Sequence, residues 1–357
     1  MRVLYFGTYE REYPRNAQVI SALRRAGVDV VERHVGVWEG RRHNWSAGPT
    51  VAARLALAEL RLLRRQRDDF NAVIVGYPGQ FDLPAARHAA RGRPVVFNPL
   101  VSLSDTLVAD RGRFAAGSLP ARVLERIDRH ALRGADLVVA DTRANADRLA
   151  EIAGLSPERI EVCFVGAEER LFSPGWAPEE PFTALFVGKL IPLHGLETIL
   201  AAARAAPDLR FRVVGSGQLE NVVRKRSQNV EWLPWVQYEL LPAELHRAAC
   251  ALGIFGTSDK AQRVIPNKAF QALACGTPLL TADTPAAREL LVHEESALLV
   301  PPGDASALAA ALRKLQADPE LGRRLGERGR AAYEAQASEQ VLGARWRALL
   351  ERATASA

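Results

Sequence analysis

The chain of 357 residues has little cysteine, methionine or aromatic residue, and it has no long apolar run. Its three cysteines, Cys163, Cys250 and Cys275, are too few for a disulfide framework and too scattered for metal-ligand spacing. No stretch of about 18 apolar residues occurs, so we predict no membrane span. The first residues also lack the apolar region of a secretory signal. We therefore expect the chain to open with a strand and to work in the cytoplasm.

Lysine is absent from residues 1–175, which hold 26 arginines and 21 acidic residues. The net charge of +6 is therefore concentrated in this half, while the second half is nearly neutral. Such an excess suits a nucleotide phosphate, an anionic membrane or a nucleic acid, and a solvated arginine-rich surface is the plain alternative. We do not expect nucleic-acid binding, because no helix-turn-helix or basic–aromatic surface motif accompanies the charge.

Short apolar runs alternate with stretches of helical periodicity along the whole chain. Runs of four to six residues without polar alternation are typical of parallel strands covered by helices on both faces. This alternation predicts an α/β fold with doubly wound, Rossmann-like sheets. The predicted strands span residues 2–6, 72–75, 95–97, 137–140, 160–165, 184–187, 211–214, 230–233, 252–255, 279–281 and 298–300.

The alternation stops once, at residues 173–181, which contain three prolines and a glycine. Proline cannot continue a helix or a central strand, so we place a domain boundary there. The predicted domains are 1–174 and 175–336, two Rossmann-like units facing a cleft, with 337–357 as a final segment. That segment carries an apolar helical stripe around Trp346, which must pack against another element.

Candidate phosphate-binding residues follow the strands of the second domain, because ligands of α/β sheets bind where strands lead into helices. Lys189 and His194 flank the first such loop, and Gly215 and Gly217 form the second. The dinucleotide fingerprint of dehydrogenases would need a third glycine at position 220, which is Glu220. The pattern therefore indicates diphosphate binding without nicotinamide chemistry. The alternative is a surface lysine, Lys189, and a histidine, His194, that only caps or packs.

The most specific stretch is 263–278, where Pro266 fits the first position of a predicted helix and Gly276 the position just past its end. Free backbone amides near Asn267 and Lys268, together with the lysine charge, predict an anion site. Gln271 lies one turn later on the same face and is placed to bond a sugar hydroxyl.

In the first domain, the loop after the first strand contains Gly7, Tyr9 and Arg15, which we expect to reach the acceptor side of the cleft, with Arg15 meeting a phosphate. A helix over 51–67 places Arg54, Arg61 and Arg65 on one stripe. This stripe is a candidate anionic-membrane surface, and a solvated helix that covers the sheet is the alternative.

The second half resembles retaining glycosyltransferases of the GT-B fold, family 4 type. Residues 270–278 are similar to that family's "EAMACGTPVV" segment, and 215–217 and 297–304 resemble its "VGxG" and "GLLVPPGD" motifs. Lys189 and His194 stand where the family usually has Arg and Lys. In the first half, only 133–142 resembles a family strand. The forms PLHG at 192–195 and IPNK at 265–268 suggest a subfamily.

This resemblance implies transfer of a sugar from a UDP- or GDP-linked donor to an acceptor, with retention of anomeric configuration and with no cofactor or obligatory metal. It implies an acceptor that is a sugar, in some relatives lipid-linked, a place in cell-surface polysaccharide or glycolipid assembly, and peripheral attachment to the membrane. The final helix would return to the first domain. Asp105 is the ionisable group nearest to the position where the family often has a catalytic-site histidine.

Two departures from the family pattern leave alternatives open. The family's two glutamates would fall on Arg263 and Gln271. Gln271 can still bond a ribose, whereas Arg263 cannot copy the contact that the first glutamate makes with the donor sugar. A catalytically silent sugar-nucleotide-binding protein, or a GT-B epimerase, therefore stands beside the transferase as an alternative.

Overall fold

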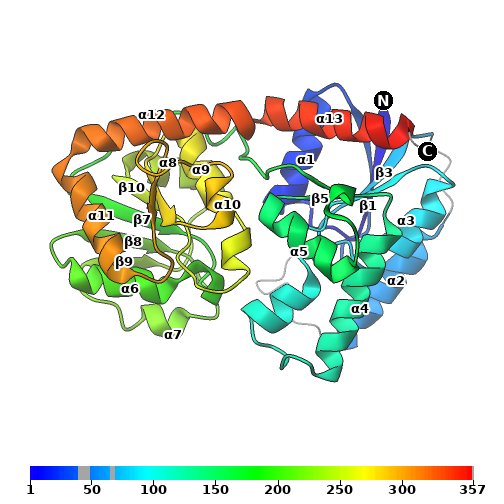
Figure 1. The fold of residues 1–357 in the computed structure, drawn as a ribbon, viewed down its shortest axis with the longest axis horizontal. Helices are drawn as coiled ribbons and strands as arrows, with labels where there is room; N and C mark the ends of the chain where they lie inside the picture. Colours follow the sequence, from blue (N-terminus) through cyan, green and yellow to red (C-terminus); the bar gives the residue numbers. More distant parts are fainter. Residues whose placement is uncertain (39–48, 65–68, 356–357) are drawn as a thin grey trace. The chain divides into compact units, whose positions relative to one another are not determined.

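The computed structural model describes residues 1–38, 49–64 and 69–355. The chain forms two compact units, which are described separately (Figure 1). Unit 1 comprises Met1–Val108, Gly112–Val165 and Glu339–Ala357, and unit 2 comprises Ala109–Arg111 and Gly166–Ser338. The sequence places the boundary after residue 174, whereas the main division of the structure falls at Val165 and Gly166.

Unit 1 contains a six-stranded parallel sheet in the order β2-β1-β3-β4-β5-β6. Alternate residues of β1 enter two apolar clusters, Leu4 on one face and Tyr5 on the other, as expected for a sheet covered on both faces. Its strands are β1 (Arg2–Gly7), β2 (Asp29–His34), β3 (Ala72–Val75), β4 (Val95–Phe97), β5 (Leu137–Ala140) and β6 (Ile160–Val162).

Strand β2 (Asp29–His34) is absent from the strands predicted by apolar runs. This strand is at the edge of the sheet and pairs only with β1. Because only one of its sides is covered, polar residues interrupt its apolar pattern, and just one of its six residues is buried. A prediction based on continuous apolar runs therefore overlooks it.

The helices of unit 1 include the last helix of the chain. They are α1 (Pro14–Arg25), α2 (Pro49–Leu62), α3 (Leu83–Ala90), α4 (Leu119–Gly134), α5 (Arg143–Ala153) and α13 (Glu339–Ala355). Helix α13 packs on α1, and Trp346 is fully buried there. The approach is close, since a Cβ on Gly343 would lie 2.4 Å from the Ala22 carbonyl oxygen. The apolar stripe around Trp346 thus packs within unit 1, as the resemblance implied.

Unit 2 contains a second parallel sheet, in the order β12-β11-β10-β7-β8-β9. Its strands are β7 (Thr183–Val187), β8 (Arg210–Val214), β9 (Val230–Leu233), β10 (Cys250–Leu252), β11 (Leu279–Ala282) and β12 (Leu298–Val300). The strand predicted at 252–255 is observed as Cys250–Leu252, so the predicted bounds were wrong by two to three residues. Phe255 is buried, but its N–H donates to the carbonyl of His194. The chain thus confirms an α/β architecture with two doubly wound sheets.

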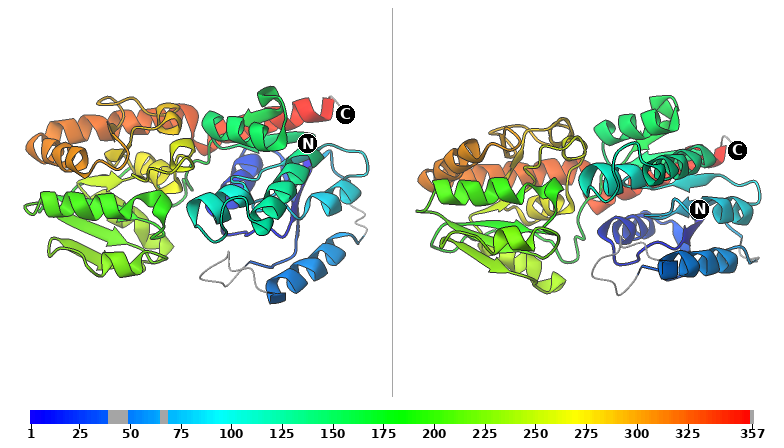
Figure 2. Two further views of the ribbon diagram at one scale, coloured as in Figure 1. Left: turned by 60° about the horizontal axis from the view of Figure 1, so that its bottom comes forward. Right: turned by 90° about the horizontal axis from the view of Figure 1, so that it is seen from below.

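The helices of unit 2 are α6 (Leu196–Ala205), α7 (Glu220–Val223), α8 (Leu241–Arg247), α9 (Asn267–Cys275), α10 (Pro285–Arg288), α11 (Ala305–Ala317) and α12 (Pro319–Gln336). Figure 2 shows both units from two further directions. Across the described residues, no helix is long and apolar enough to cross a lipid bilayer.

Candidate functional site

In unit 2, the loops that follow β7 and β8 interlock at the carboxyl edge of the sheet. Gly188 donates its N–H to the Val214 carbonyl at 2.9 Å, and Leu190 donates to the Ser216 carbonyl at 3.0 Å. A Cβ on Gly215, whose φ is +144°, would lie 1.9 Å from the carbonyl oxygen of Gly188. Only glycine permits this approach, so the backbones of the two loops meet directly at Gly188 and Gly215.

Glu220 explains why the dehydrogenase fingerprint stops short. Its carboxylate accepts the N–H of Gly217 at 3.1 Å, in the position where a third glycine would otherwise stand. Gly217 itself lies against Leu190, since an added Cβ would be 2.8 Å from that residue's carbonyl oxygen. The loop is therefore held by a side chain of the following helix, α7, and differs from the dinucleotide loop in chemistry as well as in sequence.

Lys268 is a buried cation that lacks a hydrogen-bond acceptor. It is the second residue of α9, is only 9% exposed, and its Nζ bonds to none of the described residues. The ammonium lies 3.7 Å from the centroid of the Phe186 ring. A Cβ on Gly188 would lie 2.8 Å from Nζ, so Lys268 directly contacts the loop after β7. Burial holds the pKa of Lys268 well below its usual value.

This combination is a site prepared for an anion. The first amides of α9 have no partner within the helix, and its dipole favours negative charge at that end. Pro266 precedes α9 as an extended cap residue; the prediction that it is the first helical residue was one position early. A diphosphate at this point would supply the acceptor that Lys268 lacks, and would restore the lysine pKa.

His194 lies beside Lys268 but differs from the expected cation. Its Nδ1 donates to the carbonyl oxygen of Lys189 at 2.5 Å, so the neutral ring carries its proton on Nδ1. Burial, and next the charge of Lys268, lower the pKa of His194 well below 6.5. In the free protein His194 is therefore neutral, and it adds no positive charge to this loop. The Nε2 atom of His194 becomes a hydrogen-bond donor only when the imidazole ring is protonated.

Gln271 joins α9 to the segment that follows β9. Its Nε2 donates to the hydroxyl of Tyr238 at 3.2 Å, and Tyr238 packs edge-on against Phe172 with ring centroids 5.6 Å apart. Gln271 is thus already partnered by a side chain, one turn after Lys268. Arg263 is half-buried and ends a short turn, Ala261–Arg263, just before α9.

The segment after β9 also contains Trp235, which the sequence analysis overlooked. Its side chain is 72% exposed, the most exposed aromatic ring among the described large apolar residues. Trp235 follows the end of β9, and β9, β8 and β7 are neighbours in the sheet. The distance from β7 to β9 is about 10 Å, twice the spacing of adjacent strands. The rule that directs attention to residues just after each strand would have found Trp235.

In unit 1, the three residues expected to reach the acceptor are buried. Arg15 is 0% exposed and donates to the Asn98 Oδ1 at 2.8 Å and to the backbone carbonyls of Cys163 and Phe164. Tyr9 and Gly7 are also buried. The expectation that Arg15 meets a ligand phosphate is therefore corrected. A cation at a helix start can equally bond the carbonyls of neighbouring strand ends, and here it joins β4 and β6 to α1.

A pair of carboxyl groups, Asp82 and Glu59, lies near the end of β1. Asp82 is fully buried and accepts the N–H of Thr8 at 2.7 Å. It also shares a hydrogen bond with the carboxyl of Glu59 on α2, which requires a proton on one of them. Burial, and next the contact with Asp82, raise the pKa of Glu59 to about 10. A protonated carboxyl therefore fastens α2 to the residue before α3.

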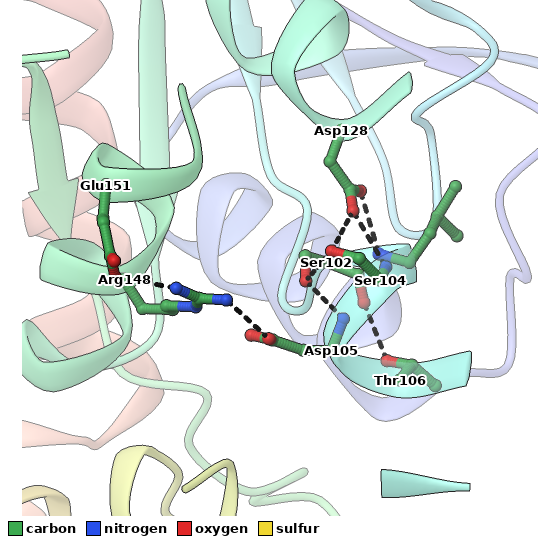
Figure 3. Close-up of polar contacts among 8 residues, drawn as sticks. Ser102, Ser104, Asp105, Thr106, Asp128, Arg148 and Glu151 are labelled. Carbon is green, nitrogen blue, oxygen red and sulfur yellow. Dashed lines mark hydrogen bonds and ion pairs between the residues drawn. The ribbon is translucent and has the colours of Figure 1, made fainter. Parts of the chain in front are cut away.

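Asp105 lies in a polar cluster after β4 (Figure 3). It begins a π-helical turn, Asp105–Asp110, and one of its oxygens is 3.4 Å from Arg148. Asp128 accepts the backbone N–H groups of Leu103 and Ser104 at 2.8 and 2.9 Å and thereby fixes this loop. Burial raises the pKa of Asp128 to about 6. Asp105 is 7% exposed, so its role as a catalytic group stays a prediction.

Two of the three arginines of the predicted membrane stripe lie within the described residues. Arg54 and Arg61 are exposed on α2, and Leu57 and Leu60 are exposed on the same helix. Arg65 lies outside the described residues. The observed α2 therefore carries apolar and basic side chains together on its solvent side.

Two family profiles match the chain. Residues 167–332 match the family described as glycosyl transferases group 1, and residues 2–166 match the glycosyl transferase 4-like domain. The two matches meet beside the junction of the two units at Val165 and Gly166.

Curated relatives include D-inositol 3-phosphate glycosyltransferases. The protein from Nocardia farcinica is 29% identical over 70% of this chain and 62% of its own length. The protein from Mycobacteroides abscessus is 28% identical over 57% of this chain and 50% of its own length. The chain thus matches less than two thirds of either relative.

Solved structures share the fold over the whole chain. Sucrose-phosphate synthase from Thermosynechococcus elongatus is similar with a TM-score of 0.79 and 18% identity, over 100% of this chain and 99% of that one. Anabaena HepE in complex with UDP-glucose is similar with a TM-score of 0.70 and 15% identity, over 100% of both. Residues 2–166 therefore belong to the glycosyl transferase 4-like domains and residues 167–332 to the glycosyl transferases group 1, in a chain whose fold is of the GT-B type.

Proposed function

We propose that this protein transfers a hexosyl group from a nucleoside-diphosphate sugar, UDP- or GDP-linked, to an acceptor with retention of anomeric configuration. The observation that carries the proposal is Lys268, a buried ammonium without a hydrogen-bond acceptor at the start of α9. The diphosphate leaving group gains negative charge in the transition state. Lys268, Lys189 and the amides of Asn267 and its neighbours are the groups assigned to stabilise it.

The rest of the donor follows from the order of the strands. With the diphosphate on Lys268 and the loop of Gly215, the nucleoside runs along the carboxyl edge of the sheet toward β9. Trp235 is the aromatic surface at that end, and Gln271, held by Tyr238, is assigned to the ribose. HepE, similar in fold, was crystallised with UDP-glucose, which supports this class of donor. Arg263 is assigned to the sugar side of the donor.

No metal or other cofactor is required in this proposal, because cationic side chains and helix amides stabilise the leaving group. No side chain is assigned as a covalent nucleophile. The acceptor is assigned to unit 1, and the cytoplasm is the assigned compartment, with a role in cell-surface polysaccharide or glycolipid assembly.

Peripheral attachment to the membrane is the further part of this proposal. Exposed Leu57 and Leu60 lie between Arg54 and Arg61 along α2. This combination of apolar and basic side chains suits the interface of an anionic membrane. Co-sedimentation with phosphatidylglycerol vesicles tests it. We expect binding that weakens with added salt, and binding that is absent or indifferent to salt would contradict it.

The decisive experiment is a thermal-shift screen of nucleotide sugars, followed by a transfer assay with the donor that stabilises the protein most. Nuclear magnetic resonance of the product then gives the anomeric configuration. A second candidate, a catalytically silent sugar-nucleotide-binding protein, is favoured by Arg263 and Gln271 in place of the two family glutamates. Donor binding without transfer or hydrolysis across acceptors would support it, and failure of UDP and GDP to bind would contradict both.

A further inference from the structure

A pocket of about 300 Å³ opens in unit 1 between the start of α3 and the outer face of α4. Phe81 and Pro84 line it from the α3 side, and Val123 and Ile127 line it from α4. The remaining lining residues are Gln80, Arg126 and His130. Its size is at the lower limit of ligand pockets, which suits a chain segment better than a whole nucleotide. None of these seven lining residues carries a carboxylate.

The face of α4 at this pocket combines an apolar and a basic row. Residues 119, 123 and 127 are apolar at four-residue intervals, and 122, 126 and 130 are Arg, Arg and His at the same interval. Four-residue spacing places each row on one side of a helix. Leu119 is 74% exposed, Val123 44% and Phe81 37%, so the apolar row continues from the pocket onto the surface.

Two of the α4 arginines are without partners, whereas the two nearer its end are used in the fold. Arg129 and Arg133 donate to the carbonyls of Ile152 and Ala153. Arg122 and Arg126 form no side-chain hydrogen bond or ion pair with any residue in the described ranges. Arg126 lines the pocket beside its apolar floor, and Arg122 lies one turn earlier in the same row of α4. Both guanidinium groups are available, and guanidinium is the side chain best suited to a phosphate.

The same helical layer, with its flanking residues, carries most of the exposed large apolar side chains of the described part of unit 1. Helix α3 contacts both α2 and α4, and all three contribute to the apolar cluster on one face of the sheet (Figure 2). Of the seven large apolar side chains of the described unit 1 that are exposed, six belong to this layer. They are Leu57, Leu60, Leu63, Phe81, Leu119 and Val123. Clustered exposed apolar side chains mark an interaction surface.

We propose that the pocket between α3 and α4 binds the apolar chain of a lipid phosphate, with the phosphate on Arg122 and Arg126. The apolar row receives the chain, the unpartnered arginines receive the charge, and the layer of exposed apolar residues faces the lipid from which the chain comes. The further statement that this lipid is the acceptor of the sugar transfer rests on the proposed function. The binding itself does not, and it is measured without any sugar donor.

The test is calorimetry of the full chain with dodecyl phosphate below its micelle concentration. We expect one molecule to bind. Val123→Trp, which fills the pocket, is expected to weaken binding at least tenfold, Val123→Thr about threefold, and Arg126→Gln about fivefold. Val292→Trp and Arg328→Gln, exposed positions on unit 2, are matched controls and leave it unchanged. Inorganic phosphate and dodecyl maltoside bind much more weakly, because each supplies only half of the ligand.

Three results would overturn the proposal. They are no binding of dodecyl phosphate, equal affinity of the wild type, Val123→Trp and Val123→Thr for dodecyl phosphate, or binding of dodecyl maltoside as tight as that of dodecyl phosphate. UDP is titrated in parallel to separate this site from the donor site. Lys268→Ala is expected to weaken UDP alone, and Val123→Trp to weaken dodecyl phosphate alone. If one of the two ligands fails to bind, the result therefore leaves the site proposed for the other ligand unaffected.

Discussion

The ammonium of Lys268 lies 3.7 Å from the centroid of the Phe186 ring, and the ring is its principal compensation in the free protein. A cation–π contact offsets only part of the cost of burying a charge. Lys268 has no hydrogen-bond acceptor among the described residues and a depressed pKa. Burial of Lys268 therefore costs the folded chain free energy, and a bound anion is what would offset that cost.

Replacing Lys268 should separate stability from binding. Lys268→Met removes a buried unpaired charge, so we expect the ligand-free protein to gain about 2–4 °C in Tm. The same change should weaken UDP or GDP binding at least thirtyfold, since charge-assisted hydrogen bonds contribute about 1.5–3 kcal/mol each. Calorimetry and thermal unfolding measure the two effects. Lys314→Met, at an exposed lysine paired with Glu294, is the control, and unchanged nucleotide affinity in Lys268→Met would contradict the donor site.

His194 should make stability depend on pH below neutrality. Its pKa is lowered in the folded protein, so between that value and 6.5 the unfolded chain binds a proton that the folded chain does not. The free energy of unfolding therefore rises with pH through this window and levels off above 6.5. His194→Gln should lose this part of the slope in denaturant titrations from pH 5 to 7.5. His88→Gln, at an exposed histidine, serves as comparison and should keep the wild-type slope.

Gly215→Ala should damage the donor site more than the rest of the fold. Its Cβ would lie 1.9 Å from the Gly188 carbonyl oxygen, and its φ of +144° is itself unfavourable for alanine. We expect a loss of about 3 kcal/mol or more in unfolding free energy and a large loss of nucleotide affinity. Gly276→Ala is the matched control: its φ is +73° with nothing within 4 Å of the new Cβ. Equal effects of the two changes would show that backbone strain alone is responsible.

Trp235→Ala should weaken nucleotide binding but leave pyrophosphate binding intact. Stacking of a base on an aromatic side chain contributes about 1–3 kcal/mol, so we expect roughly a tenfold weaker UDP or GDP complex. Trp235→Phe should recover most of the affinity, because it keeps an aromatic face. Competition calorimetry with pyrophosphate and UDP distinguishes the base from the diphosphate. An equal loss for pyrophosphate would place Trp235 elsewhere in the site.

The shared proton of Glu59 and Asp82 should make unit 1 less stable in alkali. The pKa of Glu59, about 10, is far above its ordinary 4.5, so between these values the folded chain holds a proton that the unfolded chain releases. Stability therefore falls as pH rises through this window. Glu59→Gln supplies a neutral donor at every pH, and we expect its Tm at pH 9 to exceed that of the wild type by about 2–4 °C. Glu125→Gln, at an exposed glutamate, should follow the wild type.

Most strands could be predicted from the sequence, because buried parallel strands are continuous apolar runs. The exceptions have physical causes. The edge strand β2 is half solvated, and polar residues interrupt its apolar pattern. Phe255 is apolar, but its backbone N–H donates to the carbonyl of His194 in a loop and not to a neighbouring strand. The loops that follow β7 and β8 and the start of α9 were also readable, since glycine, lysine and proline positions mark backbone turns and helix starts.

The side chains of unit 1 were harder to assign. Arg15 was expected at a ligand because it stands near a helix start, yet it bonds carbonyls at the ends of two other strands. Tyr9 and Arg15 are both fully buried in the unit 1 core. Sequence position shows which loop a residue occupies, but the direction of its side chain depends on residues far away in the chain.

The sequence by itself determined the two sheets, the approximate place of the break between them and the candidate phosphate-binding loops, because hydrophobic periodicity and glycine placement are local properties. Only the tertiary structure decided the protonation of His194, the unpaired state of Lys268 and the pocket beside Val123. Those depend on burial and on neighbours distant in sequence, which set the desolvation of each charge and the shape of each surface.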